Sequence, residues 1–126
     1  MAKKILYIED NYMNFLLVKK ILRDKDVSVE RAEDAHAALD KLRTMKPDLI
    51  LMDLHLPGMD GIELSAIIKQ TMEMAAVPII AISASCVPQD RIDAMKAGFS
   101  FFLEKPLNIR QLEETVSKIL WPDDPA

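Results

Sequence analysis

Cysteine and long apolar runs are scarce in this chain, and each scarcity excludes a class of protein. The single cysteine, Cys86, rules out an intrachain disulfide and fits a reducing compartment. No uninterrupted apolar stretch approaches the roughly 20 residues of a membrane span. The apolar run after Lys4 ends too soon to be a signal-peptide core. We therefore expect a cytoplasmic protein without membrane association.

An excess of positive charge and glycine-rich loops are also missing. The net charge is -4 at pH 7, so the chain lacks the basic stripe that binding to a phosphate backbone requires. Its three glycines form neither a Gly-x-Gly-x-x-Gly nor a Gly-x-x-x-x-Gly-Lys motif. We expect neither a nucleic-acid partner nor a bound nucleotide.

The composition does provide a globular core. Of the 126 residues, 50% are hydrophobic and 29% are charged, which is typical of one compact domain. We assign residues 1–121 to this domain. Residues 122–126 form a short acidic tail with two prolines, which we expect to fray.

Short β-type runs alternate with longer helical patterns five times. The predicted strands are residues 5–8, 27–30, 49–52, 77–82 and 99–103. The first, third and fourth runs are almost continuously apolar, which is typical of parallel strands buried on both faces. The second run alternates between apolar and polar residues, which is typical of an edge strand. The alternation predicts an α/β fold, a doubly wound parallel sheet with helices on both faces.

Apolar stripes at helical spacing indicate the helices between these strands. The stripes are Leu17, Val18, Ile21 and Leu22 within residues 12–25; Ala38, Leu39 and Leu42; Leu64, Ile67 and Ile68; Ile92 and Met95; and Leu112, Val116, Ile119 and Leu120. Gly98 is expected just past the end of the fourth helix, and Asn108 is the expected N-cap of the fifth.

Polar side chains follow four of the five predicted strands. They are Glu9 and Asp10 after the first, Asp53 after the third, Ser83 after the fourth and Lys105 after the fifth. Ligands of open α/β sheets bind at the carboxyl ends of the strands, so we expect these groups to converge. Clustered carboxylates repel one another, and an oxygen-rich pocket suits Mg²⁺. A metal, an ammonium and a hydroxyl around one carboxylate are suited to phosphoryl transfer to that carboxylate, here Asp53.

From Lys3 to about Leu120, the chain resembles the receiver domain of bacterial two-component response regulators. The motifs that carry the resemblance are Ile8-Glu9-Asp10-Asn11, the stretch from Pro47 to Asp53 with the loop from Leu56 to Gly61, Ala81-Ile82-Ser83-Ala84, and Leu103-Glu104-Lys105-Pro106-Leu107. The resemblance implies a flavodoxin-like, five-stranded sheet in the order 2-1-3-4-5. The start and the end of the chain look most like the stand-alone receivers that regulate the cell cycle.

The resemblance also implies roles for the acidic residues. Asp53 would be the phosphoacceptor. Asp10 and Asp53 would ligate Mg²⁺ directly, together with the backbone carbonyl of His55, and Glu9 would act through water. The domain would be no enzyme beyond catalysing its own Mg²⁺-dependent phosphorylation and dephosphorylation.

A second set of residues would transmit the signal. Ser83 would hydrogen-bond the phosphoryl group, Lys105 would pair with it, and Phe102 would be the switch aromatic that turns inward. His55 and Ser85 lie two residues beyond Asp53 and Ser83, and we expect both to flank the mouth of the site and to set the lifetime of the phosphoryl group. We also expect a cis Lys105–Pro106 bond. X-Pro bonds have only a small trans preference, so tertiary context can select cis, and a cis turn here would aim the Lys105 ammonium toward Asp53.

The partners follow from the same resemblance. The phosphoryl donor would be a histidine kinase or a histidine phosphotransfer protein. Because no output domain follows Leu120, the protein is expected to act on a downstream protein target, as a monomer or at most a weak dimer. A receiver that belongs to a larger protein is the alternative.

Three other functions remain as alternatives. A phosphatase of the haloacid dehalogenase type needs Asp-x-Asp, whereas the chain has Asp53-Leu54-His55. A flavodoxin-like FMN carrier needs a phosphate loop after the first strand, where Glu9 and Asp10 would repel phosphate. The third alternative is a receiver that is never phosphorylated and works only as a binding module. Such a receiver would have no need to keep Asp53, Lys105 and the acidic pair of Glu9 and Asp10.

Overall fold

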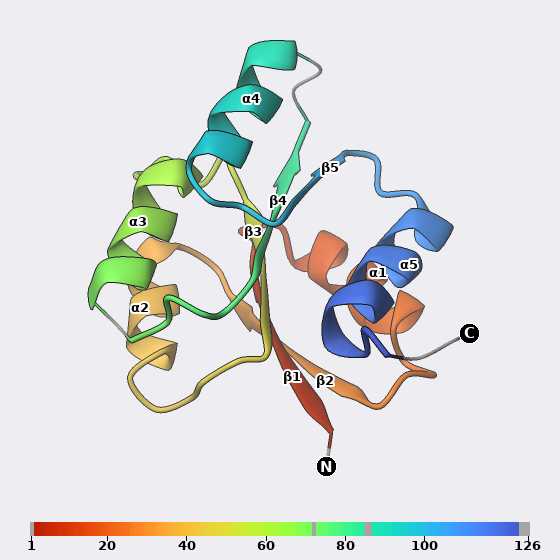
Figure 1. Cartoon of the computed structure of the whole chain (residues 1–126). Coiled ribbons are helices and arrows are strands. Elements are labelled where there is room, and N and C mark those ends of the chain that lie inside the picture. The colour runs from red at the N-terminus through yellow and green to blue at the C-terminus, as the bar shows by residue number, and fades with distance from the viewer. Residues whose placement is uncertain (1, 72, 85–86, 124–126) are drawn as a thin grey trace.

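Five parallel strands form one sheet in the order β2-β1-β3-β4-β5, as predicted. The computed structural model describes residues 2–71, 73–84 and 87–123. The strands are β1 (Lys3–Ile8), β2 (Val27–Ala32), β3 (Leu49–Asp53), β4 (Ile79–Ser83) and β5 (Phe101–Glu104). The helices are α1 (Tyr12–Ile21), α2 (Ala35–Lys41), α3 (Gly61–Thr71), α4 (Pro88–Lys96) and α5 (Ile109–Leu120). Figure 1 shows α1 and α5 on one face of the sheet and α2, α3 and α4 on the other.

The sheet divides the apolar core into two layers. Every residue of β3 and β4 is buried, which explains why these strands are almost continuously apolar. Leu6, Ile50 and Ala81 pack on the side of α2 and α3, while Ile5, Leu51 and other alternating residues pack on the side of α1 and α5. β2 is an edge strand, also as predicted.

The helix ends near the carboxyl ends of the strands are held by side-chain caps. Asn11 accepts a hydrogen bond from the Asn14 backbone N–H at 3.1 Å and so starts α1 immediately after the acidic pair. Asn108 caps α5 in the same way, and Gly98 follows α4 with φ +97°, both as predicted. The Lys105–Pro106 bond is cis, which confirms that prediction.

Two of the predicted apolar stripes were partly wrong. Ile92 and Met95 of α4 are 46% and 47% exposed, and Ala94 is the buried residue of that helix. Leu17 of α1 is likewise exposed, whereas Phe15 and Val18 are buried. Helical spacing shows that residues share a face, but it does not show which face meets the sheet.

Several predicted boundaries also need correction. α1 ends at Ile21, well before residue 25, and β4 and β5 begin two residues later than predicted, at Ile79 and Phe101. β2 continues to Ala32, beyond the predicted end at residue 30. Strand ends depend on pairing with the neighbouring strand: Ile8 of β1 pairs with Ala32, and this partner keeps β2 extended. Within the part of the chain described, no helix is long and apolar enough to cross a membrane.

Candidate functional site

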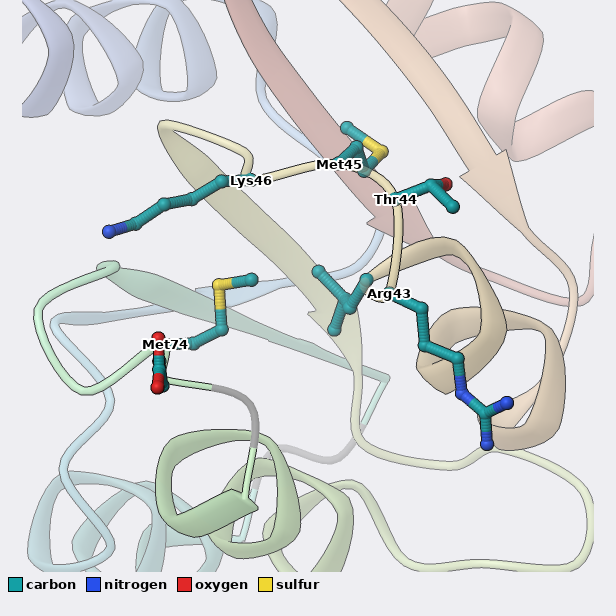
Figure 2. Close-up of a pocket in the computed structure, with 7 residues that line it drawn as sticks. Arg43, Thr44, Met45, Lys46 and Met74 are labelled. Atoms are coloured by element: carbon teal, nitrogen blue, oxygen red, sulfur yellow. The ribbon is translucent and has the colours of Figure 1, made fainter.

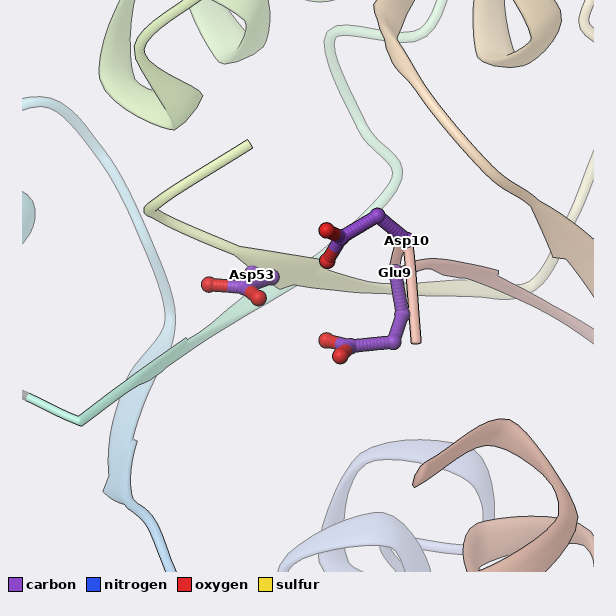
Figure 3. Close-up of side chains that lie close together, drawn as sticks. All are labelled: Glu9, Asp10 and Asp53. Carbon is purple, nitrogen blue, oxygen red and sulfur yellow. The ribbon is translucent and has the colours of Figure 1, made fainter. Parts of the chain in front are cut away.

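Three carboxylates converge at the carboxyl ends of β1 and β3, as the sequence predicted. One oxygen from each of Glu9, Asp10 and Asp53 lies within 4.8 Å of the others (Figure 3). The register explains the meeting, because Ile8 pairs with Met52 and the next residues along the two strands are Glu9 and Asp53. Glu9 and Asp53 are only 1% and 4% exposed, whereas Asp10 is exposed to solvent.

This donor set fits a magnesium ion. All three side chains offer oxygen, the ligand atom that Mg²⁺ prefers, and the exposed Asp10 leaves access for the water that Mg²⁺ usually retains. The fit rests on ligand chemistry and on the proximity of the oxygens. Glu9, Asp10 and Asp53 are therefore the residues that could hold the ion.

Lys105, which follows β5, compensates the two buried carboxylates. Its Nζ lies 3.0 Å from Asp53 Oδ2 and 3.2 Å from Glu9 Oε2. Burial alone would lower the pKa of Lys105, but the hydrogen bond and charge of Asp53, and then those of Glu9, raise it. The ammonium therefore remains charged beside the cluster at neutral pH.

The two buried carboxyl groups have opposite pKa shifts. Burial raises the pKa of Glu9, and the neighbouring Asp53 raises it further, against the lowering effects of Asn14 and Lys105. Burial acts on Asp53 in the same sense, but hydrogen bonds from the His55 backbone N–H, from Glu9 and from Lys105 outweigh it and lower the pKa of Asp53. Asp53 is thus the buried group that holds its negative charge more readily.

Ser83 and His55 meet at the side of the cluster. The Ser83 side chain is fully buried at the end of β4, and its Oγ lies 3.0 Å from Nε2 of the exposed His55 ring. The backbone N–H of His55 also donates to Asp53 Oδ1 at 2.9 Å. The structure therefore places His55 beside both Asp53 and Ser83. Ser85 lies outside the described residues.

Phe102, the predicted switch aromatic, is already inward in this structure. Its ring is 6% exposed in the core layer that contains Ala94, and the Arg91 guanidinium carbon lies 5.9 Å from the ring centroid. The prediction from the sequence was that the ring turns inward on phosphorylation. In this structure the ring is already buried while the Ser83 hydroxyl contacts the His55 ring. The inward position of Phe102 therefore does not require a prior movement of Ser83.

The sequence analysis missed two residues that position the acidic pair. Asn14 donates from Nδ2 to Glu9 Oε1 at 2.8 Å. Arg31 of β2 donates from Nε to the Glu9 carbonyl at 3.0 Å and from Nη2 to the Asp10 carbonyl at 2.6 Å, and it lies over the Tyr12 ring. Asn14 could have been found as the residue one helical turn beyond the acidic pair. Arg31 could not, because the predicted second strand stopped one residue short of it.

Replacing Arg31 by lysine is expected to loosen the loop that carries Asp10. Lysine keeps the positive charge but has no planar fork to reach two carbonyls at once. We expect the unfolding free energy to fall by about 1 kcal/mol, typical of one lost hydrogen bond, and the affinity for Mg²⁺ to fall as well. Urea unfolding and calorimetric Mg²⁺ titration measure the two effects. Arg43→Lys, on the exposed α2–β3 connection, is the control, and an Arg31→Lys protein that matches it in both measurements would show that the two hydrogen bonds are unimportant.

A hollow lies at the end of the sheet opposite the carboxylate cluster, and its charged side chains do not converge. It has a volume of about 360 Å³ and is lined by Leu42, Arg43, Thr44, Met45, Lys46, Glu73 and Met74. Figure 2 shows the side chains of Arg43 and Lys46 extending away from each other. They do not converge on a common ligand position, so the carboxylate cluster remains the candidate site.

Comparisons with known proteins agree with the fold. Residues 5–117 match the model of the response regulator receiver domain. The chain is 30% identical to the polar-differentiation response regulator DivK of Brucella anthropi, over 95% of the chain and 98% of DivK. It is 32% identical to the sensor histidine kinase GacS of Pseudomonas protegens, over 93% of the chain but only 13% of GacS, so it spans a small part of that relative.

Solved structures show the same likeness. The chemotaxis response regulator CheY4 of Vibrio cholerae superposes with a TM-score of 0.87 at 26% identity, over 95% of this chain and all of that one (100%). The receiver domain of a sensor histidine kinase from Pseudomonas aeruginosa superposes with a TM-score of 0.83 at 29% identity, over 94% and 98% of the two chains. The latter structure has a magnesium ion coordinated in its active-site cleft.

Proposed function

The chain belongs to the response regulator receiver domain family, and on that premise we propose that Asp53 is its phosphoacceptor. Members of this family are phosphoaccepting switches of two-component signal transduction and not conventional enzymes. The observation that carries the proposal is the position of Asp53: it is buried and ionised, and it lies 3.0 Å from the Lys105 ammonium. The test is whether Asp53 alone gains a phosphoryl group from a small phosphoryl donor.

The transfer step uses the Asp53 carboxylate as the nucleophile. One carboxylate oxygen forms a bond to the phosphorus while the bond between phosphorus and the donor histidine nitrogen breaks. The electron pair of that bond stays on the donor imidazole, which takes a proton from water when it becomes neutral. The lowered pKa of Asp53 favours this step because only the ionised carboxylate attacks.

The acidic cluster would hold Mg²⁺ during this step. Asp10, Asp53 and the His55 backbone carbonyl are the proposed direct ligands, and Glu9 would act through water. When bound, the ion supplies positive charge that offsets the repulsion between a carboxylate and an incoming phosphoryl group. Lys105 adds a second positive charge on the side of β5 and is free of any proton-transfer role, because it stays protonated.

The remaining parts of the proposal concern the whole protein. Receiver domains interact with histidine kinases or phosphotransfer proteins and with downstream targets, and we propose both kinds of partner for this chain. We propose that residues 1–121 form one receiver domain that acts as a monomer in the cytoplasm. It would catalyse only its own Mg²⁺-dependent phosphorylation and dephosphorylation. The net charge of -4 supports protein partners over nucleic acid.

We expect His55→Asn to shorten the lifetime of the phosphoryl group. The imidazole ring lies beside Ser83, and the His55 backbone N–H donates to Asp53, so the ring stands close to the group that would be hydrolysed. The smaller carboxamide leaves more room for hydrolytic water there. The measurement is the decay rate of the phosphorylated protein between pH 6 and pH 8. His36→Asn, in the exposed first turn of α2, is the matched control. If the His55→Asn and wild-type rates agree within about twofold at every pH, roughly 0.4 kcal/mol of barrier, the ring is a bystander and only the backbone of His55 matters.

A further inference from the structure

Gly61, the first residue of α3, lies against the backbone at the end of β3. A Cβ atom at this position would be 2.8 Å from the Leu54 Cα, 3.0 Å from the Asp53 carbonyl oxygen and 3.0 Å from Leu54 Cδ2. The first two of these neighbours are backbone atoms, which cannot rotate out of the way as the end of a flexible side chain can. The contact between α3 and β3 therefore has no room for even the smallest side chain at residue 61.

The requirement for glycine at this position concerns space and not backbone conformation. Gly58 and Gly98 have φ angles of +81° and +97°, which favour glycine, and in the part of the chain described a Cβ at either one would meet nothing within 4 Å. Gly61 shows the opposite combination, because its φ is not positive but its surroundings are tightly packed. The start of α3 thus approaches β3 more closely than a residue with a side chain would allow.

Hydrogen bonds on both sides maintain this close approach. The Gly61 N–H donates to the Leu54 carbonyl at 3.1 Å and closes the loop between β3 and α3, while the Leu54 N–H donates to the Ile82 carbonyl of β4 at 3.0 Å. At the start of α3, the Asp60 carboxylate accepts the Ile62 N–H at 2.7 Å. The end of β3 and the first turn of α3 are therefore each held in place.

Asp53 is the residue of the site that this contact affects most directly. Its carbonyl oxygen is one of the atoms that a Cβ at residue 61 would meet. Its carboxylate lies 3.0 Å from the Lys105 ammonium and accepts the His55 N–H at 2.9 Å. His55 belongs to the loop that the hydrogen bond from Gly61 to Leu54 closes, and its backbone carbonyl is a proposed ligand of Mg²⁺. Displacing the Asp53–Leu54 peptide would therefore move both the reacting carboxylate and this loop.

We propose that Gly61 is a positioning residue for phosphoryl transfer to Asp53. Because it lacks a side chain, α3 lies directly against the end of β3 and fixes where the Asp53 carboxylate stands relative to Lys105. The inference rests on the proposed phosphorylation of Asp53. It assigns the start of α3 a part in the reaction, although Gly61 carries no group that could react.

Gly61→Ala tests the proposal, with Gly98→Ala as the matched control. A misplacement of about 1 Å can cost 10²-fold in rate, so we expect labelling of Asp53 by acetyl phosphate at saturating Mg²⁺ to slow by roughly tenfold or more in Gly61→Ala. Gly98→Ala strains a positive φ just beyond α4, away from the site, and should label like the wild type. Both variants should melt below the wild type, so the comparison separates an effect on the site from a loss of stability.

Mg²⁺ binding provides a measurement that requires no phosphoryl transfer. Calorimetric titration should show weaker binding of Mg²⁺ to Gly61→Ala than to Gly98→Ala, because the displaced peptide carries Asp53 and leads into the loop of His55. A glycine that merely stabilises the fold would lower the Tm and leave both the labelling rate and the Mg²⁺ affinity equal to those of Gly98→Ala. That result would overturn the proposal.

Asp60→Ala decides the matter if Gly61→Ala does not fold, because it adds no atom to the contact. It removes the exposed carboxylate that holds the Ile62 N–H and so loosens the first turn of α3. Asp60→Asn removes the same charge but keeps a side-chain oxygen that can accept this hydrogen bond. We expect Asp60→Ala to label at least about twofold more slowly than Asp60→Asn. In that case, equal rates in the two variants would overturn the proposal.

The outcomes separate this inference from the proposed function. If the wild type is labelled on Asp53 and Gly61→Ala is labelled as fast as Gly98→Ala, the role of Gly61 is wrong and the phosphoacceptor stands. If neither acetyl phosphate nor a histidine kinase labels Asp53 in the wild type, both proposals are wrong.

Discussion

Acetyl phosphate with Mg²⁺ is expected to add one phosphoryl group to the wild-type protein and none to Asp53→Asn. The physical reason is the environment of Asp53, whose carboxylate is ionised, faces Lys105 at 3.0 Å and lies within the acidic cluster. An asparagine amide at the same place is no nucleophile toward phosphorus. Intact-protein mass spectrometry measures the added phosphoryl group, and peptide mapping shows which residue carries it.

The same labelling is expected to fall to background when EDTA removes the metal. Two negative reactants then meet at a cluster whose buried carboxylates pair, among the described residues, with Lys105 alone. Asp24→Asn, at an exposed position in the α1–β2 connection, is the matched control and should label like the wild type. Persistent labelling of Asp53→Asn, or labelling that EDTA leaves undiminished, would contradict the assignment. The protein should also release no phosphate from p-nitrophenyl phosphate above background, which separates a receiver from a haloacid dehalogenase phosphatase.

Ser83→Ala is expected to leave Asp53 open to phosphorylation but to remove most of the conformational response. Ser83 ends β4 beside Asp53 and holds its hydroxyl at the His55 ring in the resting structure. On phosphorylation that hydroxyl can move to a phosphoryl oxygen and carry the end of β4 with it. A hydrogen bond to a charged group contributes about 1.5–3 kcal/mol, and each 1.4 kcal/mol is a tenfold change in an equilibrium constant. The equilibrium constant for forming the active state should therefore be roughly 10- to 150-fold smaller in the variant.

Amide NMR spectra of α4 and β5 before and after phosphorylation measure this response. The wild type should show large shifts over residues 88–104, and Ser83→Ala should show small ones. Ser65→Ala is a matched control, because Ser65 is also a buried serine, 2% exposed, whose hydroxyl bonds the Ile62 carbonyl within α3. Shifts in phosphorylated Ser83→Ala as large as those of the wild type would separate Ser83 from the switch.

The position of Phe102 changes the energetic basis of this switch. Burial of an outward ring was the expected driving force, worth on the order of 1 kcal/mol. Because the ring is already 6% exposed, phosphorylation gains little from burying it further. In the proposed switch, the bias between the two states would then come mainly from the hydrogen bond of Ser83 and the charge on Asp53.

Much of the fold was predictable because its signals are local. Continuous apolar runs in β1, β3 and β4 can be satisfied only by strands covered on both faces, and the alternation with helices leaves a doubly wound parallel sheet. The convergence of Glu9, Asp53 and Lys105 was predictable for the same reason. Each follows a buried parallel strand, and the carboxyl ends of such strands lie at one edge of the sheet. The cap at Asn108 needed only its own neighbours.

The rest depended on tertiary contacts that have no local signal. Arg31 reaches the acidic loop only because β2 pairs with β1 in a register that places it opposite Tyr7. The His55 ring meets Ser83, 28 residues away, because β3 and β4 are neighbours. The outward position of Ile92 and Met95 depends on how α4 is rotated against the sheet. The sequence by itself thus determined the strands, their order along the chain and the residues at their ends, because these follow from burial and periodicity. Only the tertiary structure decided which side chains bond one another, because those contacts depend on register and helix rotation.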